Sequence, residues 1–258
     1  MNTKMLAVTL VALCATGAFG EVKNKQLTPE QKAAVRERMM QTTGGIIKVP
    51  GQGQLVVVNG QSRVPESVLA TQMNLIAKSL KVNVSARGGE YGQDKVGKDF
   101  DAYKASALVY VVDLPALPRV LLAIDDKWGV VNVKALAADN PSKEVLEARV
   151  SKSLVRTMAL VLGATTSRAK VSVLQSAPTL DELDKIENMA ITSDAMMNIL
   201  TSLPKLGITQ EKITTYKRAC QQGWAPSPTN DAQKAIWDSV HAMPKNPMKI
   251  EFDPKKGR

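Results

Sequence analysis

The stretch that decides the fold runs from Lys152 to Asp184 and reads KSLVRTMALVLGATTSRAKVSVLQSAPTLDELD. Its first part continues a helix that we predict to begin at Lys143, after the capping residue Ser142, and to end near Leu162. Residues three or four positions apart share a side of a helix, which gives this one two sides. The first side is apolar and should face a sheet; it consists of Leu146, Val150, Leu154, Met158 and Val161. The second side is mixed and consists of Arg149, Ser153, Arg156 and Leu160.

The same stretch resembles the zinc-binding helix, glycine turn and Met-turn of the archaemetzincins, a branch of the metzincin metallopeptidases. The family pattern is H-E-x-x-H-x-x-G-x-x-H-C, followed by a second Cys, a Met and a short acidic segment. Aligned on Gly163 without gaps, this chain keeps the frame and replaces the reactive groups. The three zinc-ligand positions hold Arg156, Leu160 and Thr166, the general-base position Thr157, the cysteine positions Ser167 and Ser172, and the Met-turn position Leu174.

The acidic segment of the family, N-S-L-x-x-x-D, falls on Pro178, Thr179, Leu180 and Asp184, and only its last two positions are kept. The resemblance covers about residues 107–188. It implies a zincin-like domain in which the mixed side of the long helix faces a cleft. An ordinary core helix followed by a loop is the alternative that the residues leave open.

A catalytic zinc needs three protein ligands and an open position for water. This chain has one histidine, His241, far from the stretch. Arg156 is a permanent cation that would repel a metal ion, and Leu160 has no lone pair. We therefore expect no catalytic residue, no metal and no cofactor in a zincin-shaped protein that is not a zinc peptidase.

Arg156 is the sharpest candidate for binding, because a guanidinium can hold a carboxylate or phosphate by two parallel hydrogen bonds. Arg149 and Ser153, on the same side of the helix, are the further candidates for ligand binding. The alternative is that Arg156 forms a salt bridge with a local acid such as Glu147.

The pattern of the whole chain predicts the α+β class, with a mixed sheet packed on the long helix and a mainly helical C-terminal part; the resemblance implies that this sheet is zincin-like. The apolar run at 107–112 is typical of a central strand, and 119–124 with 128–133 should form an antiparallel hairpin. Asn59-Gly60 should be a turn. Further strands are expected at 54–58, 81–86 and 248–254, and helices at 29–41, 65–80, 180–189, 193–203, 210–222 and 230–241.

We divide the chain into a signal peptide at 1–20, a lead-in helix at 21–44, a zincin-like domain at 45–203, and a C-terminal helical extension at 204–258 packed on that domain. Lys4, the apolar run 5–14 and the small-x-small site at 18–20 indicate export, with cleavage near Gly20. No later stretch is apolar enough for a transmembrane segment. The mature protein is thus expected to be periplasmic or secreted.

The formal charge of +10 becomes +9 on loss of Lys4, the one charged residue in 1–20. An excess of this kind suits an anionic polymer or a peptide carboxylate as partner. We expect no nucleic acid as partner, because the basic residues are scattered and aromatic residues are few.

Two other kinds of function stay open. Asp125 and Asp126 could serve an extracytoplasmic hydrolase, which would need two carboxyls facing each other across a pocket. The basic surface could instead belong to an envelope-associated structural or adhesion protein. Trp224 and Trp237 fit a packed C-terminal module better than a glycan site, and Cys220 fits a buried small residue.

Overall fold

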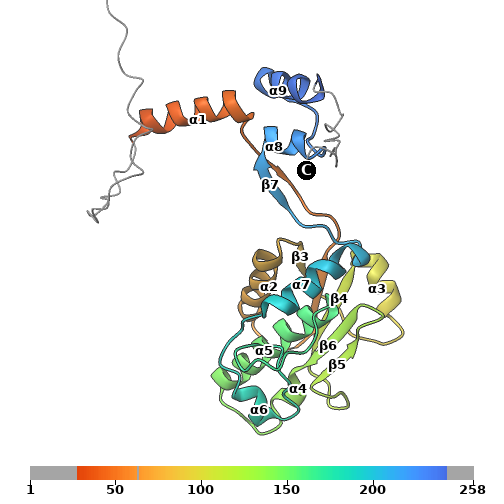
Figure 1. Cartoon of the computed structure of the whole chain (residues 1–258). Helices are drawn as coiled ribbons and strands as arrows, with labels where there is room; N and C mark the ends of the chain where they lie inside the picture. The colour runs from red at the N-terminus through yellow and green to blue at the C-terminus, as the bar shows by residue number, and fades with distance from the viewer. Residues whose placement is uncertain (1–27, 63, 243–258) are drawn as a thin grey trace, which may run out of the picture. The chain divides into compact units, whose positions relative to one another are not determined.

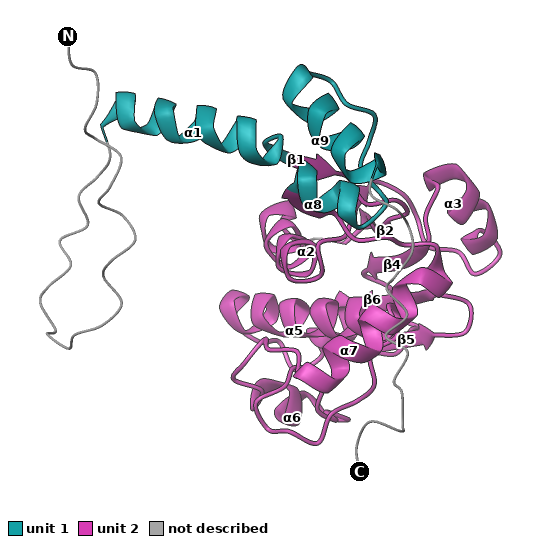
Figure 2. Cartoon of the chain, turned by 45° about the horizontal axis from the view of Figure 1, so that its top comes forward, with its two compact units in different colours: residues 1–46, 215–258 teal, residues 47–214 magenta. Residues whose placement is uncertain are grey.

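The computed structural model describes residues 28–62 and 64–242. Two compact units divide the chain: one is residues 47–214, and the other joins residues 1–46 to 215–258 (Figure 2). The expected signal peptide at 1–20 and the expected last strand at 248–254 lie outside the described residues. No helix within the described ranges is long and apolar enough to cross a bilayer.

The larger unit is built on a five-stranded sheet with β4 (Ala107–Val112) in its middle. All six side chains of β4 are buried, as its continuous apolar run predicts. The strand order is β3-β2-β4-β6-β5, with every neighbouring pair parallel except the antiparallel hairpin β5–β6. This mixed sheet confirms the predicted α+β class; its other strands are β2 (Leu55–Gln61), β3 (Val84–Arg87), β5 (Val120–Ala123) and β6 (Trp128–Asn132).

Helices α2 (Glu66–Leu80) and α5 (Lys143–Val161) pack on one face of the sheet, and α3 (Val96–Tyr103) packs on the other (Figure 1). Alternate residues of each strand point to opposite faces, so Val57 joins the core under α5 while Val58 joins the core beside α3. The predicted apolar side of α5 is buried there, with Val150, Leu154 and Met158 fully covered. Each such side chain contributes about 1.5–3 kcal/mol, which fixes the rotation of α5 about its axis.

After α5 the chain turns at Gly163, whose φ of 102° is left-handed. The next long helix passes so close that a Cβ on Gly163 would lie 2.3 Å from Ser202 Oγ. The glycine of the predicted turn therefore has both a conformational and a steric cause. The helix expected at 180–189 ends early, and the remaining helices of this unit are α4 (Val133–Leu136), α6 (Leu180–Asp184), α7 (Ser193–Ser202) and the 3₁₀ turn η1 (Leu203–Leu206).

The smaller unit contains α1 (Pro29–Thr43), α8 (Tyr216–Gln221) and α9 (Asp231–Ala242). A Cβ on Gly44 would lie 2.8 Å from Tyr216 Cβ, and Gln233 Nε2 donates to the Gly44 carbonyl at 3.0 Å. This grouping differs from the expected division, which separated the lead-in helix at 21–44 from an extension at 204–258. Pattern reading missed it because the contacts join residues nearly two hundred positions apart.

A two-stranded ribbon, β1 (Ile46–Val49) with β7 (Lys212–Thr215), lies where the chain passes between the units. The single helix expected at 210–222 is therefore wrong in its first half. The segment KITT contains three consecutive β-branched residues, which favour a strand. Thr215 then caps α8 by accepting from the Arg218 amide.

Two strand boundaries also differ from the prediction. The expected Asn59-Gly60 turn belongs to β2, which continues to Gln61 past an irregularity in its pairing with β4. Gly60 is needed there because a Cβ would lie 2.1 Å from the Gly89 carbonyl oxygen. The strand expected at 81–86 starts later, since Lys81 ends α2 in the left-handed conformation with φ 55°.

We predict that Gly60→Ala lowers the free energy of unfolding of the larger unit by about 2 kcal/mol, because the added methyl must displace backbone. Urea denaturation followed by circular dichroism measures the change. Gly88→Ala is the matched control: a Cβ at Gly88 meets nothing within 4 Å, so little change is expected. Equal losses in the two variants would contradict a steric role for Gly60.

Candidate functional site

Helix α5 carries most of the residues that the sequence singles out. Ser142 caps it by accepting from the Val145 amide, as predicted. Because the apolar side of α5 is fixed against the sheet, the directions of its other residues are fixed as well. The structure places Arg149, Ser153, Thr157 and Leu160 in buried positions and leaves Arg156 half-buried.

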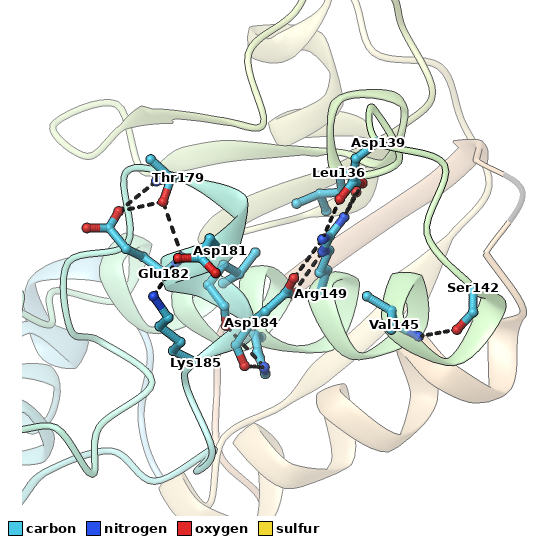
Figure 3. A network of polar contacts seen from close by, with 12 residues as sticks. Leu136, Asp139, Ser142, Val145, Arg149, Thr179, Asp181, Glu182, Asp184 and Lys185 are labelled. Atoms are coloured by element: carbon cyan, nitrogen blue, oxygen red, sulfur yellow. Dashed lines mark hydrogen bonds and ion pairs between the residues drawn. The ribbon is translucent and has the colours of Figure 1, made fainter.

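The buried Arg149 guanidinium is held by two carboxylates that are themselves exposed (Figure 3). It forms double contacts to two carboxylates: Nη1 and Nη2 donate to Asp139 at 2.6 and 2.9 Å, and Nε and Nη2 donate to Asp184 at 2.8 and 2.6 Å. Nη1 also donates to the Leu136 carbonyl at 2.9 Å. These five bonds match the five N–H groups of a guanidinium. Arg149 therefore has no donor to spare for a ligand, and its expected binding role is replaced by a structural one.

Arg149 also sets the protonation of its partners. Its hydrogen bonds hold the pKa values of Asp139 and Asp184 below their usual range. They raise the pKa of Arg149 itself. Lys152, one turn along α5, donates to the carbonyls of Leu183 and Asp184 at 3.1 and 3.0 Å. Helix α6 is thus attached to α5 through its final carboxylate and through its last carbonyls.

Arg156 occupies the position of the first zinc ligand in the aligned pattern, and its Nη1 donates to the Gln175 carbonyl. Glu147, the acid suggested as its salt-bridge partner, instead pairs with Lys143, with 3.9 Å between Lys143 Nζ and Glu147 Oε1. Burial lowers the pKa of Arg156, and the nearby charge of Arg119 adds to this effect. Arg156 therefore attaches the helix to the loop after the glycine turn.

Arg119, which the sequence analysis does not single out, lies just before β5 and completes this arrangement. Its Nη2 donates to the carbonyls of Ala177 and Pro178. The available signal is a charged residue at the start of an otherwise apolar strand. Its target, 58 and 59 positions away, is not visible in the pattern.

The other aligned positions do not converge on a ligand point. Thr157, at the general-base position, is fully buried, and its Oγ1 has no hydrogen-bond partner. A Cβ on Gly129 would lie 2.8 Å from its methyl carbon, so Thr157 fills the space that this glycine opens in β6. Leu160 and Leu174 belong to the core, whereas Thr166 is exposed.

Metal-binding side chains do not gather here. No group of three His, Cys, Asp or Glu residues able to hold a metal ion occurs within residues 28–62 and 64–242. His241 lies on α9 of the smaller unit, stacked on Trp237 with ring centroids 4.2 Å apart. Arg156 and Leu160, at two of the aligned ligand positions, offer no lone pair to zinc.

Asp125 and Asp126 lie in the turn between β5 and β6 and are both exposed. Asp126 lines a shallow cavity of about 330 Å³ with Val96, Gly97, Phe100 and Trp128. Among the described residues, no second carboxylate lines it. The arrangement needed for glycoside hydrolysis, with two carboxyls facing each other, is not found at these aspartates.

The aromatic and cysteine candidates of the smaller unit have ordinary surroundings. Trp224 Nε1 donates to Gln222 at 2.8 Å, and the Pro226 carbonyl accepts from the Tyr216 hydroxyl at 3.0 Å. Cys220 is buried, and its burial raises the pKa of its thiol. These residues pack within the unit, and Cys220 is not poised as a nucleophile.

Comparison with known proteins gives no match to a protein family and no match to a curated protein. Solved structures do match, and the first three are of archaeal proteins. The archaemetzincin of Methanopyrus kandleri is 16% identical, with a TM-score of 0.44, over 59% of this chain and 96% of that one. A zinc-dependent peptidase of Methanocorpusculum labreanum is 13% identical, with a TM-score of 0.42, over 56% of this chain and 99% of that one. The archaemetzincin of Archaeoglobus fulgidus complexed with malonate is 12% identical, with a TM-score of 0.41, over 56% of this chain and 99% of that one.

The resemblance to archaemetzincins that the sequence indicates is therefore present, but it is partial and weak. At these identities and TM-scores, what the chain does has to be inferred from its own residues.

We predict that Arg149→Met lowers the free energy of unfolding at neutral pH by about 1–3 kcal/mol, the cost of leaving the buried Leu136 carbonyl unpaired, and that it also removes both ion pairs to exposed carboxylates. The carboxylates have lowered pKa values in the folded protein. Their contribution is present above about pH 4, the usual aspartate pKa, and is lost as pH falls through the lowered values. The difference between wild type and variant should thus shrink on acidification, which urea denaturation at about pH 7 and pH 3 would detect.

The control is Lys185→Met, which breaks the exposed Lys185–Asp181 pair on α6. Exposed pairs contribute little to stability, so this variant should be close to wild type at both pH values. A loss in Arg149→Met no larger than in the control, or one independent of pH, would refute the central role of Arg149.

Proposed function

We propose that this chain is a non-catalytic zincin-like protein that acts outside the cytoplasm and binds a ligand near the former metal position instead of cleaving it. The observation that carries this proposal is the bond from Arg156, at the first aligned ligand position, to the Gln175 carbonyl. A side chain that attaches the helix to the following loop has a structural use in place of a metal. The same residue leaves a positive charge where a ligand could meet it.

The position of the general base supports the same proposal. In a zinc peptidase a carboxylate there activates the metal-bound water. Thr157 is fully buried and packs beside Gly129. A threonine hydroxyl is not basic near neutral pH, and a buried one cannot exchange protons with solvent water. Restoring hydrolysis would require changes at several of these positions together.

The basic composition supports an acidic ligand. A formal charge of +9 after loss of Lys4 (+10 less one) favours encounters with an anionic polymer or a peptide carboxylate. We expect no role for nucleic acid, because few aromatic residues accompany the basic ones. A hydrolase would need facing carboxylates, which Asp125 and Asp126 do not provide, so the binding proposal is preferred to that alternative.

The first test is elemental analysis of the purified protein for zinc, together with a broad peptidase assay. We expect less than about 0.1 zinc per chain and no cleavage, because Arg156, Leu160 and Thr166 supply no metal ligand. A known zinc peptidase purified in the same way is the positive control. Stoichiometric zinc, or cleavage that a chelator abolishes, would refute the proposal.

The second test concerns export. Expression of the full chain in a bacterial host with two membranes should give a periplasmic product. Its intact mass should correspond to a chain that begins at Glu21, because the apolar run and the small residues before Glu21 fit a cleaved signal. Gly20→Trp is the informative variant, since a large residue at the cleavage position should block processing. A full-length cytoplasmic product from the native sequence would contradict the expected location.

A further inference from the structure

Two guanidinium groups from different elements meet at one short piece of backbone. Arg156 comes from α5 and Arg119 from the residue before β5. They donate to the carbonyls of Gln175, Ala177 and Pro178, with Arg119 Nη2 at 3.3 Å from the Ala177 oxygen. Residues 175–178 span at most about 14 Å of chain. The two cationic groups are thus held close together by the loop that both contact.

The charge of this pair is not balanced in the structure. Both side chains are half-buried, and among the described residues neither forms an ion pair with a carboxylate. The influences that lower the pKa of Arg156 are burial and Arg119, and no acidic group opposes them. Arg149, two turns earlier on the same helix, shows the usual solution, because two carboxylates neutralise it. Partly buried charges are normally paired.

The donors for a partner are available. A guanidinium has five N–H groups, and each of these arginines uses one nitrogen for its carbonyl contacts. The remaining edges can hold a planar carboxylate by paired hydrogen bonds. The surrounding loop offers carbonyl oxygens, which would repel a dianion such as phosphate more strongly than a monoanion. A single carboxylate therefore fits the charge and the donors better than a phosphate.

We propose that Arg119 and Arg156 together form a binding site for a carboxylate group. The site deepens the proposed function and rests on it, since it names the ligand class of the same region. A carboxylate could come from a small organic acid or from the C-terminus of a peptide, and both present the same two oxygens to the arginines.

Isothermal titration calorimetry of the mature chain at low ionic strength tests the site. The probes are propionate, which carries a single carboxylate, against propionamide, and a short peptide with a free C-terminus against the same peptide amidated. We expect binding of at least one carboxylate probe and none of its neutral amide. The probe that binds identifies the source, and inorganic phosphate serves as the competing anion.

Arg119→Gln and Arg156→Gln should each weaken carboxylate binding about tenfold or more, the effect of losing one charge-assisted contact. Arg87→Gln is the matched control: Arg87 is exposed, belongs to the same unit and bonds only to the adjacent Ala86 carbonyl. No carboxylate binding, binding unchanged in both variants, or tighter binding of phosphate at these residues would overturn the inference.

Because both arginines also hold the loop, either variant can lose its fold, so a measurement on the wild-type protein is needed. Phenylglyoxal modifies accessible arginines, and mass spectrometry reads each position. The carboxylate probe should protect Arg119 and Arg156 and leave Arg87 unprotected; protection absent at the pair would refute the site. Bound zinc would refute the proposed function, whereas failed carboxylate binding in a zinc-free, inactive protein would refute only this inference.

Discussion

The larger unit depends on one buried cation. Arg149 is 3% exposed, and leaving any of its N–H groups without an acceptor would cost free energy. Its two carboxylates come from positions 10 residues before and 35 residues after it. The loop at Asp139 and the helix α6 must therefore both return to α5. The hydrophobic contacts of α5 with the sheet allow many arrangements of these segments, but the geometry of the guanidinium allows few.

The segment between α5 and α6 is held at three places by different means. At its start, Gly163 lets α7 approach closely. Near its end, Arg156 and Arg119 bind the carbonyls of residues 175, 177 and 178, and beyond it Arg149 and Lys152 hold α6. In a metal site, one ion with side-chain ligands can connect a helix to the loop that follows it. Here hydrogen bonds from long basic side chains connect the helix to the loop that follows it.

Local sequence patterns predicted those features that depend on interactions between neighbouring residues. The apolar run of β4, the hairpin β5–β6, the cap at Ser142 and the buried side of α5 could all be predicted, because burial and turn chemistry act over a few residues. The strand at Lys212–Thr215 was hidden by a helical spacing that its β-branched residues overrode. Gly60 resembled a turn residue, although a close approach of Gly89 explains it.

The candidate site was less predictable, because the role of each of its residues depends on hydrogen-bond partners far along the chain. Arg149 and Arg156 share a helical side and a residue type, so the sequence treats them alike. In the structure Arg149 binds two carboxylates, whereas Arg156 binds only a backbone carbonyl. Asp184, one of the two kept positions of the acidic segment, has Arg149 as its main partner. No sequence pattern identified Arg119 as a residue of this site.

The choice of arginine at positions 119 and 156 is itself informative. Closing the loop requires only N–H donors for the carbonyls of residues 175, 177 and 178. A glutamine at position 156 would carry such a donor without burying a charge. Arginine brings in addition a cation that stays protonated even where burial lowers its pKa. Placing two such cations together is unfavourable in the unliganded protein, and a bound anion would remove that cost. The excess charge, beyond what the loop needs, is the physical reason to look for a ligand here.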